Sequence, residues 1–460
     1  MFKINAPENN ENYALFERFL AKSFSFAATG LTTILRLLLI TKIRKITDKK
    51  VLFVTSTEQN ALRYPKDLVE PDTRSVSALS PGVLGTTGIE TSEIITSVCN
   101  EVKPDIVIAP VKTILEKFPD ENFYKNNSTI LKVGDEIDTK ILAQKFVDFG
   151  YKHSTMVSDI GEFSIRGDIV DFYSLDKHPV RIELWGDEIV DIRYFNNETQ
   201  KSIEKLKSTE ILPMYKFTLS DVSDDLWQKL APKDDGEEKG YFEGIEIYQN
   251  YFNDKLVTVL DYFKDYILVL DETSELYAKY EFLDKGYEEQ LQENLKLELN
   301  EILKGRNHVT FEEFIQKTAG FVKVGLNNFI DSEMDEIVEF DTQTIQSFEA
   351  NLDHIADFIR KFLSPQHNDG WRIVIATDYP ERVKEILAER NIFDVEYNES
   401  ISSHGAVLTD FKTVILTDRE LFNKRNKEIT SQKRSYYKEK PEYIENINDI
   451  KEGEYVVHSI

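Results

Sequence analysis

Residues 50–55 have the sequence Lys50-Val51-Leu52-Phe53-Val54-Thr55, an apolar run bounded by polar residues. Such a run is typical of a strand that is buried on both faces of a parallel sheet. The run Asp105-Ile106-Val107-Ile108-Ala109-Pro110 repeats this form further along the chain. A helical pattern over residues 32–43, after a short strand expected over 24–28, precedes the first run. Strands that alternate with helices predict a parallel, doubly wound α/β sheet.

The pattern changes along the chain and then returns. A helix over 138–149 and short strands follow residue 131, and buried-strand runs recur at 266–270 and 371–377. A charged, acidic helix is expected over 288–301. The predicted parts are an α/β domain (1–130), an inserted α+β domain (131–213), a continuation of the first domain (214–345), a second small α/β domain (346–423), a basic linker (424–450) and the start of a further domain (451–460).

The charge balance limits the classes of partner. The chain has 460 residues, with 82 acidic against 56 basic ones and a net charge of −26. A field of this sign repels phosphate, so a general nucleic-acid binder is excluded and any such contact needs a local basic patch. The apolar stretch over 32–40 has about half of the ~20 residues that a membrane span needs. We expect no membrane contact and a cytoplasmic location, and the single Cys99 is expected to be a small buried hydrophobic residue.

The turn after the first strand is where a nucleotide-binding α/β domain has its phosphate loop, G-x-x-x-x-G-K-[ST]. Residues 27–33 contain one glycine and no lysine, so Thr29, Gly30 and Thr32 are interpreted as a degenerate phosphate loop. Weak phosphate binding at the helix N-terminus remains an alternative. Asp271-Glu272 follows a buried strand, as magnesium-binding carboxylates do, but the pair can equally end the strand or cap a helix. No catalytic residue and no metal site are predicted, and this part of the protein is not expected to be an enzyme.

The insert contains a strictly alternating strand, Val180-Arg181-Ile182-Glu183-Leu184-Trp185. Because side chains alternate between faces, Arg181 and Trp185 are expected on the solvent face. Gly186-Asp187 fits a two-residue hairpin turn, and Arg166 is expected nearby on the preceding hairpin. Arginine and tryptophan side by side are typical of protein interfaces. The alternative is that Trp185 packs under a loop or against another part of the chain.

A long motif spans this insert. It consists of Gly161-Glu162-Phe163-Ser164-Ile165-Arg166-Gly167-Asp168-Ile169-Val170-Asp171-Phe172-Tyr173, then Arg181-Ile182-Glu183-Leu184-Trp185-Gly186-Asp187-Glu188-Ile189 and Ile192-Arg193. It resembles the damage-recognition module shared by the excinuclease subunit UvrB and the transcription-repair coupling factor (Mfd) family. UvrB keeps an intact phosphate loop, which this chain lacks. Residues 407–422 and 451–458 resemble the next domain of the coupling factor and the opening of its RNA-polymerase-interaction domain, so the coupling-factor family is favoured.

This resemblance implies a fold and a set of partners. The fold is a degenerate helicase-like, UvrB-like parallel-sheet domain with an inserted α+β domain, followed by a second small α/β domain. Within the family the insert recruits UvrA, and the matching positions here are Arg166, Arg181, Trp185, Asp187 and Arg193.

The resemblance also implies functions outside residues 1–460. A C-terminal translocase that needs ATP and Mg²⁺ displaces RNA polymerase stalled at DNA lesions. The polymerase β subunit is contacted through the domain that begins at 451, and DNA mainly through later domains. No cofactor is expected for the present residues. The strand-like end at 453–460 predicts that the sequence stops inside a longer protein. The alternatives are a UvrB-type excinuclease subunit, a separate UvrA-binding protein, and an unrelated structural α/β domain.

Overall fold

The structure is a computed structural model. It describes residues 10–68, 76–78, 103–174, 178–230, 239–242, 245–253, 255–296, 307–330, 334–364, 370–399, 401 and 404–422. Cys99, the expected basic linker (424–450) and the expected start of a further domain (451–460) lie outside these residues.

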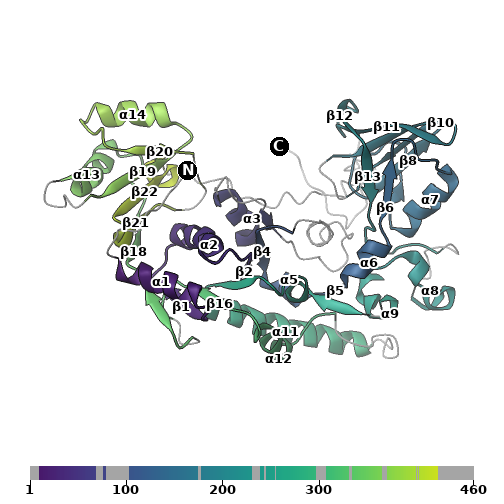
Figure 1. The fold of residues 1–460 in the computed structure, drawn as a ribbon, viewed down its shortest axis with the longest axis horizontal. Coiled ribbons are helices and arrows are strands. Elements are labelled where there is room, and N and C mark those ends of the chain that lie inside the picture. Colours follow the sequence, from purple (N-terminus) through teal and green to yellow (C-terminus); the bar gives the residue numbers. More distant parts are fainter. Residues whose placement is uncertain are drawn as a thin grey trace, which may run out of the picture.

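A seven-stranded parallel sheet forms the middle of the molecule (Figure 1), with the strand order β17-β1-β16-β15-β2-β4-β3. Its strands are β1 (Phe26–Thr29), β2 (Val51–Thr55), β3 (Val76–Ala78), β4 (Ile106–Pro110), β15 (Ile267–Asp271), β16 (Lys323–Leu326) and β17 (Ile337–Glu339). The two apolar runs that predicted buried strands are the neighbours β2 and β4, and every residue of both is buried. The predicted α/β fold class is therefore confirmed.

Helices cover both faces of this sheet, as the apolar character of β2 requires. Val51 and Phe53 pack into one core, and Leu52 and Val54 into the core on the opposite face. The first core contains α1 (Glu11–Ala21), α2 (Thr33–Thr47) and α3 (Glu58–Asp67); the second contains α5 (Val111–Leu115), α10 (Val259–Tyr262), α11 (Thr273–Lys296) and α12 (Phe311–Thr318).

Residues 288–296 of the acidic helix expected over 288–301 are the last part of α11, so the predicted start was wrong; residues 297–301 lie outside the described residues. The first half of α11 carries Leu276 and Tyr280, which lie four residues apart and are buried against the sheet. These two residues hold the first half of the helix on the sheet, whereas the acidic composition of the sequence indicated only its last part.

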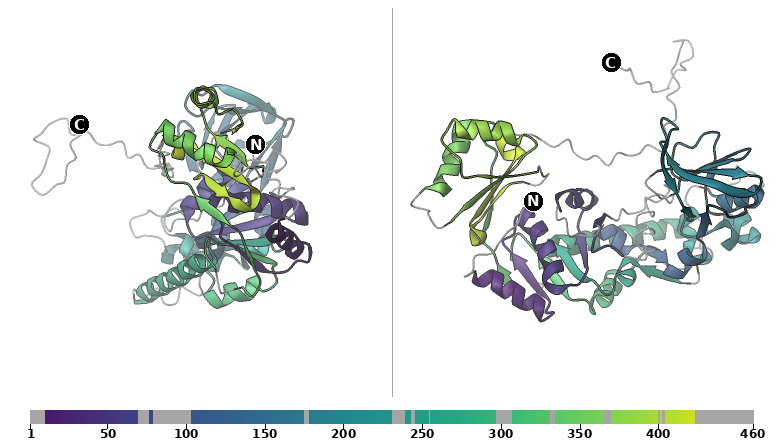
Figure 2. Two further views of the ribbon diagram at one scale, coloured as in Figure 1. Left: turned by 90° about the vertical axis from the view of Figure 1, so that its left-hand side faces the viewer. Right: turned by 45° about the horizontal axis from the view of Figure 1, so that its top comes forward.

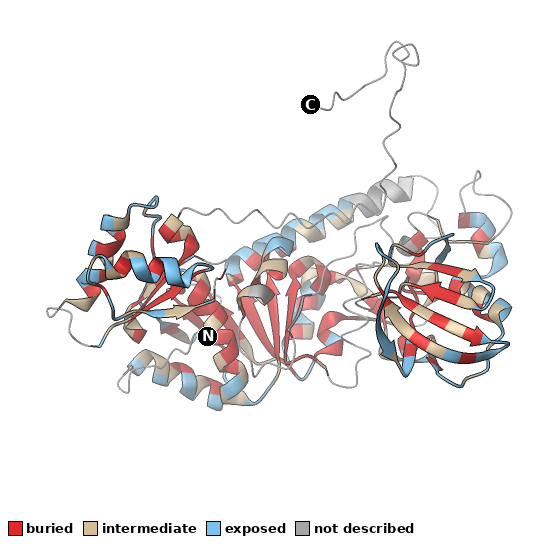
Figure 3. Ribbon diagram, turned by 90° about the horizontal axis from the view of Figure 1, so that it is seen from above, coloured by how far each residue is buried: buried red, intermediate tan, exposed pale blue. Residues whose placement is uncertain are grey.

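The insert forms a separate, mainly antiparallel sheet with the order β12-β11-β10-β9-β8-β7. Its elements are β6 (Thr129–Lys132), α7 (Thr139–Asp148), β7 (Lys152–His153), β8 (Glu162–Arg166), β9 (Ile169–Phe172), β10 (Val180–Trp185), β11 (Glu188–Phe195), β12 (Ser202–Leu206) and β13 (Ser208–Ile211), and β6 pairs with β13. Figure 3 shows buried and exposed positions along its strands. Later residues pack into the same core, from α8 (Asp224–Leu230), η3 (Ile245–Tyr248) and α9 (Gln249–Phe252), and η2 (Leu219–Asp221) precedes α8.

Short elements connect the insert to the main sheet. Strand β5 (Lys117–Pro119) pairs with β14 (Leu256–Thr258), and α6 (Glu121–Asn126) leads into β6. The insert therefore leaves the main sheet after β4 and returns to it at β15. The predicted domain limits remain a prediction.

A third unit contains a five-stranded sheet with the order β18-β21-β22-β19-β20. Its elements are β18 (Thr342–Thr344), α13 (Leu352–Leu363), β19 (Arg372–Ala376), α14 (Pro380–Ala388), β20 (Glu396–Asn398), β21 (Ala406–Leu408), η6 (Thr409–Phe411), β22 (Thr413–Thr417) and α15 (Asp418–Phe422). Phe340 stacks on Phe411 at 6.0 Å between ring centres and joins this unit to the main sheet. This unit and the insert lie at opposite ends of the molecule (Figures 1 and 2).

Candidate functional site

The outer face of the inserted sheet carries the residues that were predicted to bind a partner. Val180, Ile182 and Leu184 of β10 are buried in the insert core, as their alternation predicts. Trp185 at the end of β10 is 82% exposed, more than any other large hydrophobic side chain in the described residues. The alternative that Trp185 packs against another described part of the chain is therefore wrong.

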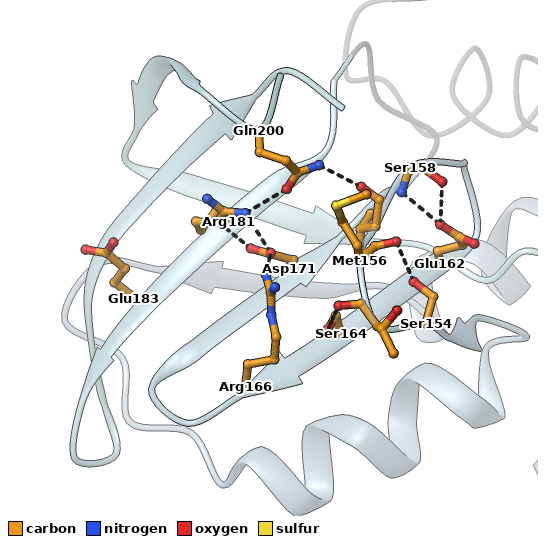
Figure 4. Close-up of polar contacts among 12 residues, drawn as sticks. Ser154, Met156, Ser158, Glu162, Ser164, Arg166, Asp171, Arg181, Glu183 and Gln200 are labelled. Atoms are coloured by element: carbon orange, nitrogen blue, oxygen red, sulfur yellow. Dashed lines mark hydrogen bonds and ion pairs between the residues drawn. The ribbon is translucent and has the colours of Figure 1, made fainter. Parts of the chain in front are cut away.

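Arg166 and Arg181 meet at one carboxylate. Figure 4 shows both side chains pointing toward Asp171 of β9, from β8 and β10. Arg181 donates from Nε and Nη2 to the two oxygens of Asp171 at 2.6 and 2.8 Å, and Arg166 donates from Nη2 at 2.6 Å. The Asp171 side chain is fully buried, whereas 48% of the Arg166 side chain is exposed. The predicted proximity of Arg166 to Arg181 is thus observed, and Asp171 is the group that joins them.

Arg181 is also fixed on its other sides. Its guanidinium carbon lies 4.5 Å from the centre of the Phe195 ring. Its Nη2 donates to Oε1 of Gln200 at 3.1 Å, and Gln200 in turn donates to the carbonyls of Val157 and Asn197. The Arg181 side chain is consequently held in one position before any partner arrives.

Arg193 belongs to a second group beside the first. It lies directly across from Arg181 in the β10–β11 pair and forms ion pairs with Glu183 and Asp191. The hydrogen bond with Glu183 raises the pKa of Arg193 and lowers the pKa of Glu183. Lys205 of β12 adds a second cation at Asp191, at 2.8 Å. Arg193 is therefore paired within the sheet rather than free for a partner.

Asp187 lies in the exposed turn between β10 and β11, apart from both arginine groups. Backbone hydrogen bonds hold this turn to the segment before α7: the Ile137 amide donates to the Asp187 carbonyl at 2.8 Å, and the Gly134 amide donates to Ile189 at 2.8 Å. The tip that carries Trp185 is consequently anchored on two sides.

Three functional candidates were missed from the sequence: Asp171, Gln200 and Asp191. Asp171 is a polar residue inside the apolar strand β9, and this was the only signal available. The β9–β10 register places its partner Arg181 directly opposite it, and the β8–β9 register places Arg166 opposite Ile169, two residues away on the same strand.

The degenerate phosphate loop lies between β1 and α2, where Thr29, Gly30 and Thr32 were predicted to form it. Its amides are already bound within the chain. The amides of Gly30 and Leu31 donate to the carbonyls of Asn328 and Asn327 at 3.1 Å, and the Thr32 amide donates to Oγ1 of Thr342 at 3.0 Å. The Thr29 carbonyl accepts from the Phe340 amide. The loop is therefore closed by the segments after β16 and β17.

A guanidinium occupies the position beside Asp271 at the end of β15. Arg36 of α2 lies 2.6 Å from Oδ1 of Asp271 and 2.9 Å from Oε1 of Glu272, and the Tyr64 hydroxyl donates to Asp271 at 3.2 Å. Burial raises the pKa of Asp271, and Arg36 partly opposes this shift. Burial alone would lower the pKa of Arg36, but Asp271 and Glu272 outweigh it and raise that pKa.

ATP with Mg²⁺, which the helicase-like fold implies elsewhere, does not fit these residues. The loop amides that would receive phosphate are hydrogen-bonded to other backbone and side-chain groups. The carboxylates that would receive the metal are bound by Arg36. No chemistry through a nucleotide is derived for this site.

No group of three or more His, Cys, Asp or Glu side chains in the described part of the chain is arranged to hold a metal ion. Among the described helices, none combines the length and the apolar character needed to cross a membrane.

Two family models match parts of the chain. The family model of the UvrB interaction domain matches residues 130–217, which include β8 to β12. A second model, that of germination protease, matches residues 47–121. In that segment the described residues contain β2, α3 and β4 of the main sheet, and no protease chemistry is inferred.

Curated relatives extend the similarity beyond the insert. A transcription-repair-coupling factor of Staphylococcus aureus (strain bovine RF122 / ET3-1) is 25% identical over 406 residues, and one of Staphylococcus haemolyticus (strain JCSC1435) is 26% identical over 400 residues. Each alignment covers 77% of this chain and 34% of the relative, so the chain spans about a third of the length of these relatives. The resemblance found in the sequence is confirmed: the chain is similar to transcription-repair-coupling factors over 77% of its length, and its residues 130–217 match the model of the UvrB interaction domain.

Proposed function

We propose that this chain is the N-terminal region of a transcription-repair coupling factor and that the outer face of its insert recruits UvrA. The observation that carries the proposal is the exposed Trp185 on the same strand as Arg181 of the Arg166–Asp171–Arg181 cluster, inside the segment that matches a UvrB interaction domain. Tryptophan and arginine are the residue types enriched among those that carry most of the binding energy of protein interfaces, so a partner protein accounts for the 82% exposure of Trp185.

The surface suits an acidic or amphipathic protein partner better than nucleic acid. Four cationic side chains lie on the outer face, Arg166, Arg181, Arg193 and Lys205, but Asp171, Glu183 and Asp191 neutralise most of their charge. A phosphate backbone is bound through uncompensated lysine and arginine. About half of the Arg166 side chain is exposed, so Arg166 can still donate a hydrogen bond to a carboxylate of a partner. Trp185 supplies apolar area at the hairpin tip.

The test is a binding assay between UvrA and the full chain. Trp185→Ala and Arg181→Ala are each expected to cost about 2 kcal/mol or more, which is roughly a 30-fold weaker affinity. Phe393→Ala is the matched control, because Phe393 is also a highly exposed aromatic residue (75%) but lies in the third unit, at the other end of the molecule. Unchanged affinity in both site variants would refute the proposal.

The remaining functions concern longer relatives and stay proposals. They are ATP-driven translocation, contact with the RNA polymerase β subunit, contact with DNA, and a cytoplasmic location. The alternative of a UvrB-type excinuclease subunit is less well supported, because such a subunit needs a working phosphate loop and the amides of this loop are bound to Asn327, Asn328 and Thr342.

A further inference from the structure

Asp171 is a buried carboxylate with an unusual number of cationic partners. Its side chain has no exposed surface, and three guanidinium nitrogens from two arginines donate to its two oxygens. A charge buried this completely is tolerated when it is paired and hydrogen-bonded. Here one carboxylate pairs with two guanidinium groups, so the cluster of Asp171, Arg166 and Arg181 has a net charge of one positive unit.

The strand register places this carboxylate between the two arginines. Arg181 lies directly opposite Asp171 on β10 and approaches it with Nε and Nη2 together, the two-pronged geometry that guanidinium and carboxylate favour. Arg166 reaches the same carboxylate from β8 through one nitrogen. The common anion therefore sets the distance between two like charges that would otherwise repel each other.

The two arginines differ in how much they face solvent. The Arg181 side chain is 15% exposed and is fixed by Phe195 and Gln200, whereas nearly half of Arg166 is exposed. The Asp171 ion pair is the only interaction of Arg166 with a side chain that the structure records in the described residues. Without Asp171, Arg166 would sample many rotamers, and a partner would have to order it on binding.

We propose that Asp171 is a positioning residue for the UvrA-binding surface: it holds Arg166 and Arg181 as one preorganised pair and does not itself contact UvrA. This inference rests on the proposed function. Ordering a long side chain at an interface reduces affinity by several-fold, so losing the order of two arginines is expected to weaken binding about tenfold or more.

The experiment measures UvrA affinity of the full chain with Asp171→Asn, which keeps the size of the side chain and removes its charge. Binding is expected to weaken about tenfold. The same substitution in an Arg166→Ala/Arg181→Ala background is expected to have no further effect, because Asp171 acts only through these arginines. Glu204→Gln is the control: Glu204 is an exposed carboxylate on β12 of the same sheet, away from both arginines.

A second variant keeps the inference testable if Asp171→Asn does not fold. Arg181→Lys retains the positive charge but cannot form the two-pronged pair, so it is expected to lose as much affinity as Arg181→Ala. Three results would each overturn the inference. They are an Arg181→Lys variant that binds UvrA as tightly as the wild type, an Asp171→Asn variant that binds UvrA more tightly, and an Asp171→Asn substitution that weakens binding equally in the wild type and in the double-alanine background. If Trp185→Ala and Arg181→Ala weaken binding but Asp171→Asn does not, the positioning role fails and the proposed function stands. If none of the three weakens binding, both fail.

Discussion

Replacing Arg36 by methionine tests whether the Asp271 site is a structural ion pair. Methionine retains an unbranched apolar stem in place of the arginine stem and removes the charge that lies 2.6 Å from Asp271 and 2.9 Å from Glu272. The variant leaves a carboxylate buried at the end of the central strand β15, and among the described residues only Tyr64 remains as a side-chain donor to it. Removing one partner of a buried pair costs about 3–5 kcal/mol, and this is the expected loss in the stability of the main sheet at neutral pH.

The loss should depend on pH in a definite direction. Burial already raises the pKa of Asp271, and Arg36 is the main group that opposes the shift. In Arg36→Met the pKa of Asp271 therefore rises further. Because the native state then binds a proton more tightly than the unfolded chain, the penalty is absent at low pH. It grows as pH rises from the ordinary aspartate pKa, about 3.9, to the folded pKa. We expect a smaller loss at pH 5 than at pH 8.

Amide hydrogen exchange in β2 and β15 is the suitable assay, because it reports the opening free energy of this sheet apart from the other units. Arg360→Met is the matched control, with exchange measured in β19 and β22 of its own unit: its ion pair with Asp357 has a similar length, 2.9 Å, but both side chains are at least half exposed, so a change within about 0.5 kcal/mol is expected. Asp271→Asn in the Arg36→Met background should restore part of the stability. A loss below about 1 kcal/mol, or one that does not shrink at pH 5, would refute the structural role.

Three further predictions concern other positions. Gly30→Ala should destabilise the main sheet by about 1–3 kcal/mol more than Gly134→Ala destabilises the insert. Both glycines have a positive φ, but a Cβ at Gly30 would lie 1.9 Å from the Phe340 carbonyl oxygen, whereas a Cβ at Gly134 would meet no atom within 4 Å. Equal losses of stability, measured by hydrogen exchange, would contradict this. Trp185→Ala should leave the melting temperature of the insert nearly unchanged, since the side chain makes little contact there, and a clear drop in calorimetry would show that it is structural. Glu420→Gln should cost about 1–3 kcal/mol at pH 7. Burial raises the pKa of Glu420, but hydrogen bonds from His404, Thr417 and Gly405 outweigh burial and lower this pKa. The stabilisation by the Glu420 carboxylate is therefore complete above pH ~4.3 and is lost at lower pH. A loss of stability in Glu420→Gln that does not change with pH in urea unfolding would contradict this.

Local patterns in the sequence were sufficient for the strands but not for their contacts. The apolar runs at β2 and β4 and the alternation of β10 follow from burial on two faces or on one, which a short segment reveals by itself. The pairing of Arg36 with Asp271 joins residues 235 positions apart, and that of Arg181 with Asp171 depends on a register between strands. Neither is encoded by composition or spacing. The start of α11 was missed for a related reason: its first half is amphipathic against the sheet, and only its acidic second half is conspicuous.

The two arginine–aspartate clusters show how burial decides what the same pair of side chains does. At Asp271 the carboxylate and the guanidinium are both buried under helices, so the pair has no surface to present and its effect is confined to the stability of the main sheet. At Asp171 the carboxylate is fully buried and Arg181 is mostly buried, but the exposed half of Arg166 remains available on the same sheet as Trp185. The Asp171 carboxylate is already desolvated in the free protein. The free energy of its desolvation therefore reduces the stability of the fold and does not reduce the affinity for a partner. This difference is why we assign a structural role to the first cluster and a binding role to the second.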